Sequence, residues 1–220
     1  MPRTVTRPDW LVPAALILLA LVPMIAGMAR LNDLATGTAS SETARSHAAP
    51  LPVVLHIIGA TIYALLGAFQ FTSARHTKWH RVAGRVAFPM GLLAASSGIW
   101  MTLTYPWANA DGEAVYVARL IFGAGMAVAL ILGVTTILRG DVAAHRAWML
   151  RAYAIGMGAG TQVFTHMPWF LLVGPPTEGP RAVMMIGAWV LNLAVAEWII
   201  ANDKRRAGPT PTRRPILNFL

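Results

Sequence analysis

The stretch WLVPAALILLALVPMIAGMA, residues 10–29, decides the class of this protein, because it carries no charged residue. A transmembrane helix needs about 20 consecutive apolar residues, so this stretch predicts a membrane span. It exceeds the apolar core of about 7–15 residues in a cleaved signal peptide, which favours a retained helix. The composition agrees: 56% of the 220 residues are hydrophobic and only 12% are charged, which excludes an ordinary soluble enzyme.

Five further apolar runs follow, and none alternates as the strands of a membrane β-barrel do. The sequence therefore predicts an all-α, polytopic transmembrane bundle with six spans, forming one domain over residues 1–206. The predicted spans cover about residues 10–29, 51–71, 86–105, 115–138, 147–170 and 182–202. We expect residues 31–50 to form an outer loop and residues 207–220 to form a basic, proline-rich cytoplasmic tail.

Basic residues gather in alternate connections between these spans. With the N-terminus inside, the cytoplasmic segments hold most of the 18 lysines and arginines, which predicts that both termini are cytoplasmic. We expect the protein to lie in the lipid bilayer of a bacterial inner (plasma) membrane. Nucleic-acid binding would be another explanation of the net charge of +9, but the charges flank spans and no recognition motif is present.

Several kinds of chemistry are excluded by what the sequence lacks. There is no cysteine, and therefore no disulfide, thiolate metal site or iron–sulfur cluster. No nucleophile–base pattern or phosphate loop occurs, and the sequence does not decide whether the protein is an enzyme. Gly156-Met-Gly158-Ala-Gly160 has the glycine spacing of a dinucleotide loop, but it lies inside a predicted span and follows no strand.

Two pairs of predicted spans share a pattern that suggests an internal duplication. Spans two and three, with the loop between them, contain Gly59, Arg75 and His80. Spans four and five, with their loop, contain Gly123, Arg139 and His145. Repeats of this kind are common in membrane folds. The alternative is that inner loops in general end in histidine or arginine.

Short motifs between residues 50 and 170 together resemble a known bacterial family. They are His56-Ile-Ile-Gly59, Gly67-Ala-Phe-Gln70-Phe71, His80-Arg81-Val-Ala-Gly84-Arg85, Ser97-Gly98 and Asp141-Val-Ala-Ala-His145-Arg146-Ala-Trp148-Met149-Leu-Arg151-Ala-Tyr153. On these residues the chain resembles the membrane-protein family called domain of unknown function 2306. The resemblance implies a helical membrane bundle and supplies no activity. The chain departs from the family late in the fifth span, where Thr165-His166-Met167-Pro168 stands in place of a frequent arginine.

Polar residues near the outer ends of the spans form a first candidate site. They are His56, Arg119, Gln162 and His166. Two neutral imidazoles on different helices are able to ligate haem iron, and an arginine at the same depth is able to pair with a propionate. His56 and His166, with Arg119, are therefore candidates for binding haem b; the alternative is simple hydrogen bonding between helices. No other metal is expected, because two histidines without a carboxylate fall short of a zinc site.

A second layer of polar residues lies near the inner ends. His80 and His145 are candidates for a second haem, and the candidate anion-binding residues are Arg81, Arg85, Arg146 and Arg151. The alternative is positive-inside anchoring, in which these side chains reach the headgroups. We also expect Arg151 to pair with Glu197 in the last span, because the pair offsets the cost of placing both charges there.

Three functions from different classes are compatible with these features. The first is a b-type haem-binding electron-transfer protein linked to quinone. The second is a small-anion transporter or carrier, and the third is a non-catalytic membrane accessory protein with a protein partner.

Overall fold

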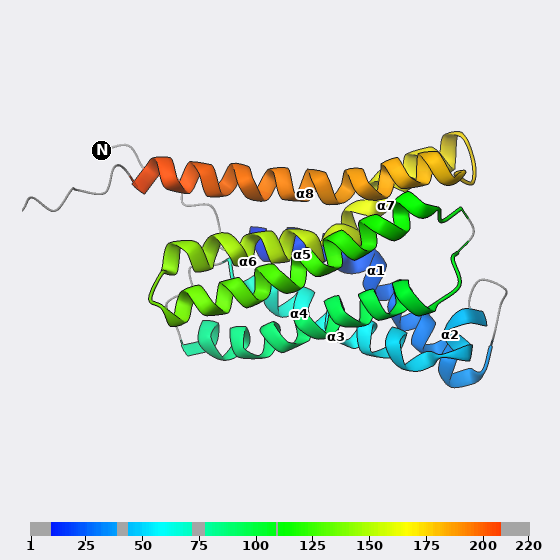
Figure 1. Cartoon of the computed structure of the whole chain (residues 1–220), viewed down its shortest axis with the longest axis horizontal. Helices are drawn as coiled ribbons and strands as arrows, with labels where there is room; N and C mark the ends of the chain where they lie inside the picture. The colour runs from blue at the N-terminus through cyan, green and yellow to red at the C-terminus, as the bar shows by residue number, and fades with distance from the viewer. Residues whose placement is uncertain (1–9, 39–43, 72–77, 109, 208–220) are drawn as a thin grey trace, which may run out of the picture.

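The computed structural model describes residues 10–38, 44–71, 78–108 and 110–207, and this part of the chain is helical without strands (Figure 1). Its helices are α1 (Leu11–Thr36), α2 (Ala44–Ala48), α3 (Pro50–Phe69), α4 (Lys78–Thr104), α5 (Glu113–Leu138), α6 (Val142–Gly156), α7 (Gly158–Leu172) and α8 (Glu178–Ala207). Outside these ranges lie most of the predicted tail and the basic residues Arg3, Arg7, Arg75, Arg213 and Arg214.

Five of these helices are long and apolar enough to cross a membrane: α1, α3, α4, α5 and α8. They confirm the all-helical membrane bundle and coincide with five of the six predicted spans. The number of spans and the orientation stay predictions. Three helices are longer than expected. α8 runs from Glu178 to Ala207, beyond the predicted span of residues 182–202 at both ends. α1 continues through residues 31–36, which were predicted as loop, and α4 begins at Lys78, so that Arg81 and Arg85 are helical.

The predicted fifth span, residues 147–170, is divided at Met157 into α6 and α7. A side chain from α8 bridges the break. The Asn192 amide donates to the Ala154 carbonyl at 3.0 Å, and the Thr161 hydroxyl donates to the Asn192 amide oxygen at 2.8 Å. Because polar side chains re-satisfy the backbone at helix breaks inside membranes, Asn192 explains how the chain tolerates this one.

The glycines around the break allow close approach of three other helices. A Cβ atom at Gly156 would lie 2.9 Å from a ring carbon of Tyr63 on α3, and one at Gly158 would lie 2.1 Å from the Trp189 indole nitrogen on α8. At Gly160 the obstacle is the Leu19 carbonyl oxygen of α1, at 2.4 Å. The glycine spacing that resembles a dinucleotide loop therefore serves helix packing.

The largest buried cluster lies where α3, α4, α5 and α6 meet. It contains Tyr63, Met126, Leu130, Tyr153 and Met157. The Tyr153 hydroxyl donates to the Ala64 carbonyl at 2.8 Å, which ties α6 to α3. In Figure 1, α8 lies along one side of the α5–α6 pair, and the bundle has apolar residues on its outside, as expected in lipid.

Two ion pairs join α6 to α8 near the predicted inner ends. The Arg151 guanidinium donates to the Glu197 carboxylate at 2.5 and 2.9 Å, and Arg146 donates to Asp203 at 2.8 Å. The expected pair between Arg151 and Glu197 is confirmed. It joins two helices over 46 residues of sequence.

Replacing Glu197 by alanine is expected to lower thermal stability in detergent, and Arg151→Ala is expected to do the same. The cost should stay below the roughly 2.5–3.5 kcal/mol of a charge at the bilayer centre, because the pair lies near the helix end. The measurement is a double-mutant cycle on melting temperature. Single variants that melt with the wild type would contradict a stabilising pair.

Candidate functional site

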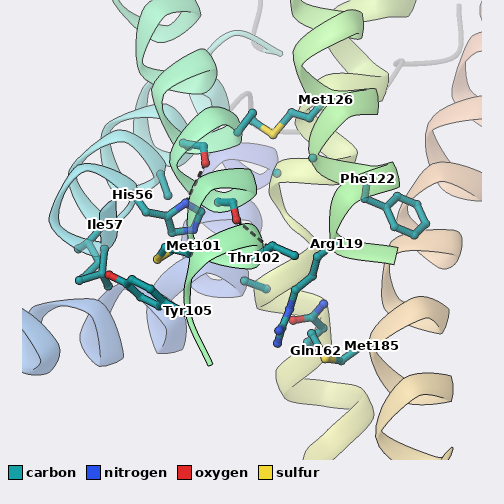
Figure 2. A pocket seen from close by; sticks show the side chains of 18 of the residues that line it. His56, Ile57, Met101, Thr102, Tyr105, Arg119, Phe122, Met126, Gln162 and Met185 are labelled. Atoms are coloured by element: carbon teal, nitrogen blue, oxygen red, sulfur yellow. Dashed lines mark hydrogen bonds between the residues drawn. The ribbon is translucent and has the colours of Figure 1, made fainter. Parts of the chain in front are cut away.

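A cavity of about 510 Å³ lies at the end of the bundle where α3, α5 and α8 begin and α1 and α4 end. This volume falls within the range of about 300–1,000 Å³ that is typical of small-molecule sites. Its walls come from all eight described helices, α1 to α8, and a close view of it shows apolar side chains with a few polar ones among them (Figure 2). We call it the outer cavity, after the predicted orientation.

Three of the four residues in the predicted outer layer line this cavity: His56, Arg119 and Gln162. Figure 2 shows His56 on one side, with Arg119 and Gln162 across from it. The fourth, His166, lines a smaller neighbouring cavity that shares Gln162 with the outer cavity. The structure therefore brings His56 and His166 to adjacent cavities and not into one.

The His56 ring is held in a defined orientation. Its Nδ1 lies 2.8 Å from the Ala94 carbonyl oxygen of α4. A carbonyl only accepts, so Nδ1 carries the proton, and the neutral ring presents Nε2 as an acceptor. Gly98 leaves room for the ring, because a Cβ atom there would lie 3.3 Å from its Cε1. The resemblance motifs containing His56 and Ser97-Gly98 thus meet in space.

Gln162 supplies a buried hydrogen-bond donor in the same cavity. Its side-chain nitrogen is buried and has no hydrogen-bond partner among the described residues. Its backbone carbonyl accepts from His166 Nδ1 at 2.8 Å within α7. Buried polar groups are nearly always satisfied in proteins, so an unpaired amide at a cavity wall indicates a bound molecule or water.

A buried carboxylate, that of Asp111, lines the outer cavity. The Asp111 side chain is only 2% exposed and pairs with Arg119 of α5 and Arg181 of α8, each at 2.7 Å. Burial pushes the pKa of Asp111 upward, but the hydrogen bonds and charges of the two arginines outweigh this effect and hold the pKa below its usual value. Asp111 thereby ties the loop between α4 and α5 to two helices.

The sequence did not identify this arrangement around Asp111. Arg119 was assigned to a cofactor propionate, whereas the structure places its guanidinium on the Asp111 carboxylate. A loop acid has no periodicity that would indicate its partners, and Arg181 is 70 residues away in sequence. An arginine inside an apolar span was the available signal, since it must find a partner.

The residues predicted to form an inner anion site or a second haem site lie at separate places in the structure. Arg146 and Arg151 carry carboxylate partners on α8, while Arg81 and Arg85 are exposed on α4. His145 contacts the Gly133 carbonyl at 2.7 Å, and neither His145 nor His80 lines either cavity described above. The four arginines do not converge on one anion site in the described part of the chain.

Ligands for a metal ion are sparse as well. The described residues contain no group of three or more histidine, cysteine, aspartate or glutamate side chains able to hold a metal. Haem needs only axial ligands from the protein, and an imidazole nitrogen such as His56 Nε2 is an atom of the type that binds haem iron. Haem binding through His56 and His166 together is not supported by their places in two cavities.

A comparison with family models matches residues 53–200 to DUF2306, described as a predicted membrane protein. The chain belongs to the DUF2306 family. No curated protein and no solved structure matches it. The matched region of this DUF2306 protein runs from Val53 in α3 to Ile200 in α8, and it therefore includes every wall of the outer cavity except those of α1 and α2.

Proposed function

We propose that this DUF2306 protein binds a quinone-class ligand in the outer cavity and takes part in electron transfer within the membrane. The observation that carries the proposal is His56, whose fixed Nδ1 leaves Nε2 as an acceptor at the cavity wall. A quinol has hydroxyl groups that donate to such an acceptor. Its ring is apolar and lipid-soluble, which suits a largely apolar cavity inside a membrane bundle.

The unpaired Gln162 amide complements His56. A quinone carbonyl accepts a hydrogen bond, and the buried Gln162 nitrogen is a donor without a partner in the described residues. One acceptor and one donor across a single cavity match a ligand that alternates between carbonyl and hydroxyl forms. When a quinol is oxidised to a quinone, its two electrons pass to a redox partner outside this chain and its two protons are released; a neutral imidazole within hydrogen-bond reach is a suitable first proton acceptor.

We expect the purified protein in lipid nanodiscs to bind a short-chain benzoquinol, and His56→Ala to weaken that binding about tenfold, since a hydrogen bond is lost. Affinity is measured by titration calorimetry. His166→Ala is the matched control, because His166 lies on α7 in the smaller cavity and should leave the affinity unchanged. Equal affinity in wild type and His56→Ala would contradict the role of His56.

A b-type haem ligated by His56 is the second candidate, and the same free Nε2 favours it. Metal-bound histidines commonly donate their other ring nitrogen to a carbonyl, as His56 does to Ala94. Met101 and Met126 also line the cavity, and methionine is an axial ligand partner of histidine in some cytochromes. An absorption spectrum before and after dithionite tests this candidate, since haem b gives a Soret band and sharp reduced bands.

Variants would then assign the haem ligands. Loss of the bands in His56→Ala alone would point to His56 with a ligand other than His166, and loss in both histidine variants would restore the pair predicted from sequence. Bands that persist in both would direct attention to His80 and His145. A colourless protein would exclude this candidate and leave quinone binding to the titration.

Anion transport has less support than either redox ligand. Arg146 and Arg151 at the inner end each hold a carboxylate, and Arg119 in the outer cavity shares the Asp111 carboxylate with Arg181. An arginine that already holds a carboxylate has fewer donors left for a substrate anion.

A further inference from the structure

The outer cavity and the smaller cavity beside it have part of their walls in common. Three residues line both cavities: Ala159 and Gln162 of α7 and Met185 of α8. The smaller cavity has a volume of about 270 Å³, and its remaining lining residues come from the same two helices: Val163, His166 and Arg181. The two cavities therefore adjoin along the seam between α7 and α8.

The smaller cavity also borders a surface of α7 that carries exposed apolar side chains. Phe164 comes directly after the cavity residue Val163 and is 64% exposed. Met167 comes directly after the cavity residue His166 and is 53% exposed. Phe170 lies seven positions after Val163, hence on the same face of the helix, and is exposed as well. Apolar side chains on the outside of a membrane bundle face lipid, so the smaller cavity lies at the edge between the bundle and the bilayer.

Two polar side chains at this edge offer hydrogen bonds of opposite kinds. The Arg181 guanidinium uses its Nε on Asp111 at 2.7 Å and carries further N–H donors. His166 donates from Nδ1 to the Gln162 carbonyl at 2.8 Å, so its Nε2 is an acceptor. An apolar ring with oxygen substituents finds both a donor and an acceptor here as it leaves lipid. Contacts made only during entry change the rate of binding and not the affinity, as expected for His166→Ala.

We propose that the seam between α7 and α8 is the entrance by which a lipid-soluble ligand passes from the bilayer, through the smaller cavity, into the outer cavity. The entrance rests on the proposed function, because a quinone-class ligand reaches its site from lipid. Ala159 decides whether the way is open. Its side chain is a single methyl group, and this exposed residue lines both cavities. A longer side chain there would fill the junction between them.

The test uses the absence of cysteine from the chain. A single cysteine in place of Thr102, which lines the outer cavity and not the smaller one, reports the arrival of a thiol reagent there. Two reagents are compared in lipid nanodiscs: the lipid-soluble N-phenylmaleimide and a charged, water-soluble methanethiosulfonate. We expect Val163→Phe and Ala159→Leu each to slow labelling of Thr102→Cys by the maleimide about tenfold, as overpacking of a passage does, and to leave the rate of the charged reagent unchanged.

Val163→Phe is the more specific variant, because Val163 lines the smaller cavity and not the outer one. Val183→Phe and Ala194→Leu on α8 are the matched controls. Both replace exposed residues that line neither cavity, and both rates should stay as they are.

Maleimide labelling at the control rate in Val163→Phe and Ala159→Leu would overturn the entrance, and so would equal slowing of the two reagents. A Thr102→Cys protein that the maleimide does not label at all would overturn it too. Labelling needs no quinone, so each of these results leaves quinone binding in place. Failure of the wild-type protein to bind a quinol or quinone in the titration would instead overturn the proposed function, whatever the labelling shows.

Discussion

Replacing Asp111 by alanine is expected to cost about 3–5 kcal/mol of stability, the largest effect of any polar substitution considered for this protein. The reason is that one buried carboxylate holds two arginines from different helices, Arg119 and Arg181, at 2.7 Å each. Without it, two partly buried cations lose their counter-charge, and the loop between α4 and α5 loses its ion pairs with α5 and α8.

Thermal unfolding in detergent measures this effect, with Glu113→Ala as the control. Glu113 is an exposed acid in the first turn of α5, so its removal should cost only about 0.3–1 kcal/mol. Asp111→Asn keeps the shape and removes the charge, and it should melt close to Asp111→Ala if charge is what matters. If Asp111→Ala melts no lower than Glu113→Ala, the ion pairs of Asp111 with Arg119 and Arg181 do not stabilise the fold.

The Asp111 carboxylate also makes the stability of the fold depend on pH, with lower stability expected in acid. The pKa of Asp111 is lower in the folded state than in the unfolded state, because of its two arginines. Its contribution is therefore fully present above the unfolded pKa of about 3.9 and is lost as the pH falls through the folded value. Asp111→Asn should remove this part of the acid-induced loss of stability, as seen in melting temperatures below about pH 4.

The sequence predicted the parts of the fold that depend on long apolar runs. Five helices coincide with predicted spans, because a chain in lipid satisfies its backbone hydrogen bonds only in a helix or a closed barrel, and these runs lack the alternation of barrel strands. Counting residues from the span ends placed His56, Arg119, Gln162 and His166 in one outer layer. The first three line the outer cavity, whereas His166 lines the smaller cavity beside it.

Contacts between distant segments were not predictable in the same way. Neither hydropathy nor spacing indicates that Asn192 of α8 takes the Ala154 carbonyl and so bridges a break in the fifth apolar run. This contact is a consequence of how helices pack, which a single sequence does not encode locally.

The break between α6 and α7 leads to the second large prediction, which concerns Gly160. Alanine there is expected to cost about 1–3 kcal/mol, as overpacking of a tight core does. Its Cβ atom would lie 2.4 Å from the Leu19 carbonyl oxygen, which is backbone of α1 and is unable to rotate away. The helices α1 and α7 would have to separate, and the outer cavity, to which both contribute, would change shape.

Gly187→Ala on α8 is the matched control, because nothing lies within 4 Å of a Cβ atom there. In a helix interior this change should be neutral or stabilising by up to about 1 kcal/mol, so the two variants should shift the melting temperature in opposite directions. The contrast separates close packing from helix propensity, which favours alanine at both positions. If Gly160→Ala were as stable as Gly187→Ala, α1 would not be packed against the break, and the α1 wall of the outer cavity would be placed wrongly.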